Sequence, residues 1–101
     1  MEIGSMTKFF MSTAIEGKLL EKHGVSKSEV FESIRNRVSD SFLTETRVEH
    51  ITNLPSYWFI APTDAGRDLK VVFIYFQAAN ELHIKTAYEP NKEERRIWRE
   101  I

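Results

Sequence analysis

The sequence contains no cysteine, which excludes disulfide-stapled scaffolds, thiol nucleophiles and cysteine-ligated zinc sites. This absence suits a reducing compartment, so the cytoplasm is the expected location. No apolar run is long enough for a membrane span, and the first residues lack the charged, apolar and small-residue order of a signal peptide. Neither sign of charge predominates, because the chain has 14 basic and 15 acidic residues. We therefore expect no membrane contact and, at most, a local patch for nucleic acid.

The chain does have enough apolar sequence for one hydrophobic core. Of its 101 residues, 42% are hydrophobic and 12% are aromatic. A second core could not be filled at this length, so residues 6–101 are predicted to form a single domain. Residues 1–5 precede a second methionine and are either a cloning remnant or native sequence, so the fold prediction leaves them out.

A first helix is predicted over residues 13–23. Ser12 or Thr13 suits the N-cap, apolar residues recur at helical spacing, and Gly24 stands where a left-handed residue would end the helix. Residues 7–11, which precede it, are β-branched and aromatic. They can form a short strand, which would be the fourth of the sheet.

A second helix is predicted over about residues 27–37. Ser26 and Glu29 have the spacing of a capping box, and an apolar stripe follows them. The next segment, residues 38–56, is polar and mixed, alternates weakly, and contains Pro55 near its end. It is predicted to be mostly loop with extended pieces.

The second half of the chain is predicted to form a three-stranded antiparallel meander. Residues 57–61 are strongly β-forming, and residues 63–67 supply turn chemistry for a hairpin into residues 69–76. That strand is apolar on both faces, so it belongs in the middle of the sheet. Residues 77–81 form the second turn, and residues 82–88 form the third strand.

The third strand alternates between an apolar face and a face that is free for function. Pro90 ends it, Asn91 can cap a helix, and residues 92–101 have a basic amphipathic pattern. The predicted fold class is therefore α+β, with two N-terminal helices, the meander and a C-terminal helix. On the third strand, Leu82, Ile84, Thr86 and Tyr88 are predicted to share one face, and His83, Lys85 and Ala87 the other.

The common signatures of enzymes and metal proteins are missing. His23, His50 and His83 fall in different elements, without cysteine or carboxylates at ligand spacing, so no metal site is expected. The glycine-rich phosphate loops and the nucleophile motifs are absent as well. Any catalysis must therefore come from scattered polar residues.

Several cations are predicted to converge at one edge of the meander. Arg67 and Lys70 enter the central strand where Tyr88 leaves its antiparallel neighbour, and the chain then turns into the helix that carries Arg95. Such cations would offset phosphate charge, while a phenol, imidazole or carboxylate moves protons. In the alternative interpretation these are ordinary solvent-facing side chains. The candidate set is Arg67, Lys70, His83, Lys85, Tyr88, Glu89 and Arg95.

Three segments of this region match a pattern known from a protein family. They are residues 66–73 (GRDLKVVF), residues 83–91 (HIKTAYEPN) and residues 94–98 (ERRIW), with a weaker match at residues 22–25 (KHGV). Together they resemble the small bacterial proteins related to the BrnT toxins, within the RelE/ParE-like toxin group. The resemblance implies a RelE-like fold.

It also implies a bacterial toxin–antitoxin component that is silenced by a cognate antitoxin. Proteins of the RelE type cleave RNA without a metal or cofactor, by activating a ribose 2′-hydroxyl against the adjacent phosphate. The resemblance thus implies an endoribonuclease or an inactive relative of one, and the alternative from the residues is a non-catalytic protein-binding module. Carried onto this sequence, the resemblance implies phosphate binding by Arg67, Lys70 and Arg95. It implies proton transfer by Lys85, Tyr88 or His83.

Overall fold

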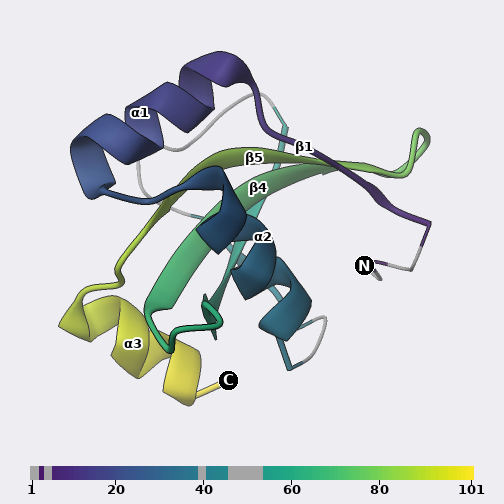
Figure 1. The fold of residues 1–101 in the computed structure, drawn as a ribbon. Coiled ribbons are helices and arrows are strands. Elements are labelled where there is room, and N and C mark those ends of the chain that lie inside the picture. The colour runs from purple at the N-terminus through teal and green to yellow at the C-terminus, as the bar shows by residue number, and fades with distance from the viewer. Residues whose placement is uncertain (1–2, 4–5, 39–40, 46–53) are drawn as a thin grey trace.

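A computed structural model of the chain describes residues 3, 6–38, 41–45 and 54–101. Within these residues the chain forms three helices and one mixed sheet of five strands (Figure 1). None of the helices in the described part is long and apolar enough to cross a membrane. In chain order the elements are β1 (Lys8–Phe10), α1 (Thr13–His23), α2 (Lys27–Asn36), β2 (Leu43–Thr44), β3 (Ser56–Pro62), β4 (Asp68–Phe76), β5 (Glu81–Tyr88) and α3 (Lys92–Arg99).

The predicted α+β class and the antiparallel meander of β3, β4 and β5 are confirmed. The sheet is wider than expected, with the strand order β1-β5-β4-β3-β2. β1 runs parallel to β5 at one edge, and β2 runs antiparallel to β3 at the other. β2 has only two residues and comes from the segment that was expected to be mostly loop, so its alternation is too short to detect. Residues 46–53 of that segment lie outside the described residues.

The helix caps act as the sequence predicts. The hydroxyl oxygen of Ser12 accepts a hydrogen bond from the backbone N–H of Ile15 at 3.1 Å, and Gly24 ends α1 with φ at +60°. Ser26 and Glu29 make both hydrogen bonds of the capping box that starts α2. These caps satisfy backbone groups that would otherwise lack a partner at the helix ends, and so fix where α1 stops and α2 begins.

The helices lie on both faces of the sheet. α1 and α2 lie on the same side (Figure 1), where α1 contacts β5 and α2 contacts β3 and β4. Alternate strand residues face these two helices and form the core with them. Trp58 points the opposite way and packs against Trp98 of α3, with ring centroids 5.9 Å apart. The core residues that the sheet contributes are Phe59, Ala61, Leu69, Val71, Phe73, Leu82, Ile84 and Ala87.

The predicted alternation of the third strand is wrong beyond its middle. The register between β4 and β5 shifts between Val72 and Phe73: Val72 pairs with Thr86, but Phe73 pairs with Ile84. Lys85 is therefore the extra residue of β5 at this point, as in a β-bulge, and the side chains after it change faces. Ala87 is consequently fully buried in the core. Thr86 and Tyr88 were expected to share the face of Leu82 and Ile84, but they pair with Val72 and Lys70, which lie outside the core cluster.

Part of the N-terminal segment contributes to the fold. Ile3 is buried in the core cluster, and its carbonyl oxygen accepts a hydrogen bond from the guanidinium of Arg37 at 3.4 Å. Residues 1–2 and 4–5 lie outside the described residues. The fold prediction left residues 1–5 out, but Ile3 packs in the core.

Replacing Phe73 with alanine is expected to lower the free energy of unfolding by about 3–5 kcal/mol, because the side chain is fully buried on the central strand. Urea denaturation followed by tryptophan fluorescence measures this loss. Phe76→Ala on the same strand is the matched control, since Phe76 is 37% exposed and should cost only about 1 kcal/mol. Equal losses for the two variants would contradict the central position of Phe73.

Candidate functional site

The predicted cationic cluster does not form a single surface. Residues alternate along β4, so Lys70 points away from the core side on which Leu69 and Val71 lie. Arg67 reaches the opposite side, where it contacts the junction of α1 and α2. Arg67 and Lys70 were expected to converge at one edge of the meander, but the structure places their cationic groups on opposite faces of the sheet.

Arg67 ties three parts of the fold together. Its guanidinium donates to the backbone oxygens of His23 at 3.0 Å and Gly24 at 2.9 Å, at the C-terminal end of α1. It also donates to Glu29 at 3.2 Å and to Glu89 at 2.7 Å. The positive charge thus meets two carboxylates and the negative end of a helix dipole. Arg67 is consequently bound within the protein rather than presented to a phosphate.

Arg95 is paired as well. Its guanidinium donates to the carboxylate of Asp68 at 2.8 Å, and both side chains are about 40% exposed. This contact joins α3 to the start of β4. The pair is partly accessible, but a phosphate would have to compete with the carboxylate that Arg95 already holds.

Lys70 is buried within an ionic cluster between β4 and α3. Its side chain is 2% exposed, and its ammonium donates to Glu45 at 3.0 Å and to Glu94 at 2.9 Å. The ammonium also lies 4.5 Å from the ring centroid of Trp58, on whose face it gains cation–π attraction. Lys70 borders a small depression of about 200 Å³, whose wall also carries Glu45, Glu93 and Glu94. These carboxylates would repel a phosphate.

The cluster also engages Tyr88. The phenol donates a hydrogen bond to Glu94 at 2.8 Å, and its burial and this bond raise the pKa of Tyr88. Burial alone would raise the pKa of Glu94, but the bonds from the Asn91 backbone and from Lys70 outweigh it and lower that pKa. For Lys70, burial alone would lower the pKa, but the hydrogen bonds to Glu94 and Glu45 outweigh it, so the pKa of Lys70 is raised. The contacts among Lys70, Glu94 and Tyr88 therefore favour a fixed ion pair of Lys70 with Glu94 and a neutral phenol, and none of the three groups is set up to exchange a proton with a ligand.

His83 lies at the other end of β5. Its ring stacks on Phe10 with centroids 4.9 Å apart, meets the ring of Phe76 edge-on at 4.8 Å, and lies 3.0 Å from the carboxylate of Glu81. His83 is five positions before Tyr88 on the strand, which corresponds to about 16 Å. The structure therefore does not bring His83 together with Lys85 and Tyr88 as one site.

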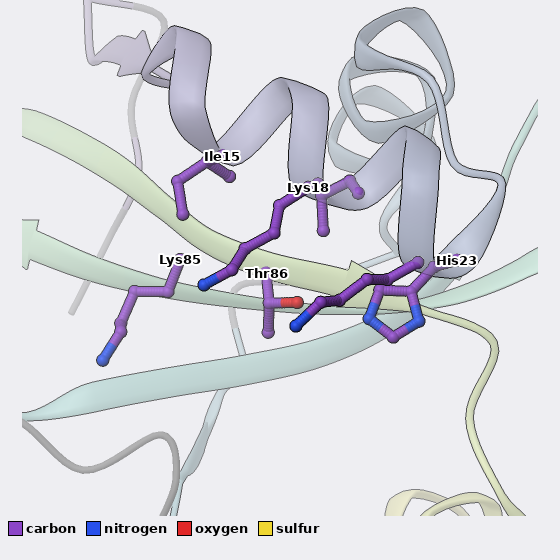
Figure 2. A pocket seen from close by; sticks show the side chains of 7 residues that line it. Ile15, Lys18, His23, Lys85 and Thr86 are labelled. Atoms are coloured by element: carbon purple, nitrogen blue, oxygen red, sulfur yellow. The ribbon is translucent and has the colours of Figure 1, made fainter.

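Lys85 instead joins a set of side chains that the sequence did not group. A surface pocket of about 340 Å³ lies between α1 and β5, and Figure 2 shows Lys18 extending from α1 toward β5, which carries Lys85 and Thr86. Because β1 pairs only with residues 81–83 of β5, the chain leaves the sheet there and α1 can approach the strand at residues 85–86. We name this site the lysine pocket, with the polar lining residues Lys18, Lys22, His23, Lys85 and Thr86.

The lysine pocket concentrates positive charge at an electrostatic cost. Lys18 and Lys22 are four residues apart on α1, a spacing at which like charges repel. Among the described residues, neither lysine forms an ion pair, and none of the described lining residues is acidic. The dipole of α1 favours cations in its last turn, which accounts for Lys22 and His23 but not for Lys18. A bound anion would remove the remaining repulsion.

The pocket also contains groups other than ammonium ions. The ring of His23 lies against the ring of Tyr88, with centroids 5.4 Å apart. Thr86 adds a hydroxyl that both donates and accepts. The arrangement can bind an anion, donate hydrogen bonds and move a proton. Two signals for it were present in the sequence: the four-residue lysine spacing, and residues 22–25, which matched the family pattern weakly.

We expect Lys70→Met to lower the free energy of unfolding by about 3–5 kcal/mol, because it leaves two carboxylates buried without their cation. Chemical denaturation at neutral pH measures the change. Lys92→Met is the matched control, since Lys92 is exposed on α3 and its loss should stay within about 0.5 kcal/mol. If both variants unfold at the wild-type midpoint, the ionic cluster does not stabilise the fold.

The sequence was compared with models of protein families and with curated proteins, and neither comparison found a match. The function is therefore inferred from the contacts and charges of the chain's own residues, together with the resemblance of residues 66–73, 83–91 and 94–98.

Proposed function

We propose that this chain is the toxin-like component of a bacterial toxin–antitoxin pair, and that it binds RNA in the lysine pocket as a metal-independent endoribonuclease. The observation that carries the proposal is the pocket itself, where three lysines and a histidine line about 340 Å³ with no acid among the described lining residues. RNA is the anion that the family resemblance implies.

The required chemistry needs few groups. In metal-independent cleavage, the ribose 2′-oxygen loses its proton and attacks the adjacent phosphorus, and the bond to the 5′-oxygen breaks. The products carry a 2′,3′-cyclic phosphate and a 5′-hydroxyl. Negative charge builds up on the phosphoryl oxygens during this step, so fixed ammonium groups lower its barrier. Lys18, Lys22 and Lys85 are the side chains that supply this charge.

The roles of the predicted residues change accordingly. Lys85 keeps its place in the site. Arg67, Lys70 and Arg95, which the resemblance assigned to phosphate binding, are held by carboxylates and stabilise the fold around the pocket. Tyr88 contributes its ring as a support for His23.

A non-catalytic protein-binding module is the second candidate. It is favoured by the aromatic surface around His83, where Phe10 is 40% exposed and Phe76 is 37% exposed. This surface lies at the other end of β5 from the lysine pocket. The two functions therefore depend on different residues, and substitutions separate them.

Binding to single-stranded RNA should be weak and sensitive to salt. With three lysines on phosphates, the logarithm of the association constant should fall with the logarithm of salt concentration with a slope of about −2. In the variant Lys18→Ala/Lys22→Ala the slope should be about −0.7, because one contact remains. Titrating a labelled RNA oligomer that carries 2′-O-methyl groups, which block cleavage, gives these slopes.

The matched control is Lys27→Ala/Lys92→Ala. It removes the same net charge from two exposed helix positions outside the pocket. Its slope should stay near the wild-type value. If both double variants change the slope equally, binding follows net charge and not the pocket.

Induced expression in a bacterial host without the cognate antitoxin should arrest growth. Lys85→Ala should relieve the arrest, because it removes one of the ammonium groups that face the reacting phosphate. Growth curves and immunoblots that confirm equal protein levels give the measurement. Lys92→Ala is the control and should arrest growth like the wild type. If the wild type does not slow growth, the protein-binding module becomes the better description.

A further inference from the structure

We propose that His23 is the residue that accepts the proton of the ribose 2′-hydroxyl. This inference rests on the proposed function, and it assigns the proton transfer of the cleavage reaction to a residue of α1 instead of a residue of β5. The inference begins with the composition of the pocket. Its other ionisable described lining residues are lysines, which suit phosphate binding. Histidine is the side chain that most often serves as a general base near neutral pH.

The backbone of His23 is fixed by Arg67, which is not among the residues that line the pocket. Arg67 donates to its carbonyl oxygen at 3.0 Å and to that of Gly24 at 2.9 Å. Arg67 is in turn held by Glu89 at 2.7 Å and by Glu29 at 3.2 Å. The end of α1 is therefore tied both to the start of α2 and to the chain just after β5.

The ring of His23 is supported as well. It lies against the ring of Tyr88 at 5.4 Å between centroids, and the phenol of Tyr88 is anchored on Glu94 at 2.8 Å. Figure 2 shows the imidazole at one end of the pocket and Lys85 at the other, and Lys22 of α1 also lines the pocket. A base that is held on both its backbone and its ring keeps its orientation toward a bound ligand, which is what general base catalysis requires.

The proposed step balances without any further reactant. The imidazole takes the proton from the 2′-oxygen, whose electron pair forms the new bond to phosphorus. The bond from phosphorus to the 5′-oxygen breaks, and the 5′-oxygen takes a proton from water. The imidazolium then returns its proton to the solvent. The ammonium groups of Lys18, Lys22 and Lys85 balance the charge on phosphate.

The experiment separates cleavage from binding in the variants His23→Ala and His23→Gln. Cleavage of a 5′-labelled single-stranded RNA oligomer is followed under single-turnover conditions, and binding is measured on the 2′-O-methyl oligomer. Both variants should cleave about 100-fold more slowly, with a dissociation constant within about threefold of the wild type. Added imidazole should restore part of the cleavage in His23→Ala, where it can occupy the vacated space, and less in His23→Gln.

His83→Ala is the comparison for the histidine that the resemblance pointed to. Because His83 lies at the opposite end of β5, cleavage should follow His23 and not His83. Thermal melting by circular dichroism verifies that His23→Ala and His23→Gln remain folded, as expected for an exposed side chain.

The outcomes against the inference are distinct from those against the proposed function. If the His23 variants cleave like the wild type, or if His83→Ala alone abolishes cleavage, His23 is not the base, while RNA cleavage stands. If the wild type binds RNA without cleaving it, His23 transfers no proton and the chain is an inactive relative. If the wild type does not bind the oligomer at all, the proposed function fails, and this inference fails with it.

Discussion

The fold depends on how it accommodates the buried charge of Lys70. An ammonium that is 2% exposed on the side chain is stable only if carboxylates surround it, and Glu45 and Glu94 do so at 3.0 and 2.9 Å. These partners come from the chain just after β2 and from α3, so the charge on β4 fixes both against the sheet. Glu94 also accepts a hydrogen bond from the phenol of Tyr88, and the ring of Tyr88 supports the ring of His23. The geometry of the lysine pocket thus depends on a charge on the opposite face of the sheet.

The register shift at Lys85 has a second effect on the same pocket. Without it, the strand would continue its alternation and place Tyr88 on the core face and Ala87 on the other. With it, Ala87 fills the core beneath α1 and α2, while Tyr88 meets Glu94. Bulges are common next to functional sites because they re-aim side chains in this way. Here the shift places Lys85 beside α1 and Tyr88 beside His23.

The sequence was sufficient for most of the elements and insufficient for the site, for physical reasons. The capping residues Ser12, Ser26 and Asn91 act over three or four positions, so they could be recognised locally. The β-forming residues 7–11 indicated β1 but not its parallel pairing with β5, and β2 has only two residues, so no local period indicates it. The candidate site failed because a topological argument places residues at one end of a sheet but not on one face. A strand alternates its faces at every residue, and that separated Arg67 from Lys70.

Charge pairing explains how a chain with net charge −1 can present a cationic surface. The cations that look most accessible in the sequence, Arg67, Lys70 and Arg95, each meet a carboxylate at 3.0 Å or less. Their charges are compensated within the protein, and these ion pairs connect α3, β4 and the junction of α1 and α2. Lys18 and Lys22 are different, because among the described residues they meet no carboxylate at such a distance. The net charge of the chain counts the paired and the unpaired cations alike. It therefore does not reveal the local positive field of Lys18 and Lys22, whose range in solution is about 10 Å. A short polyanion held within that range of α1 would meet the unpaired lysines before it met the compensated ones.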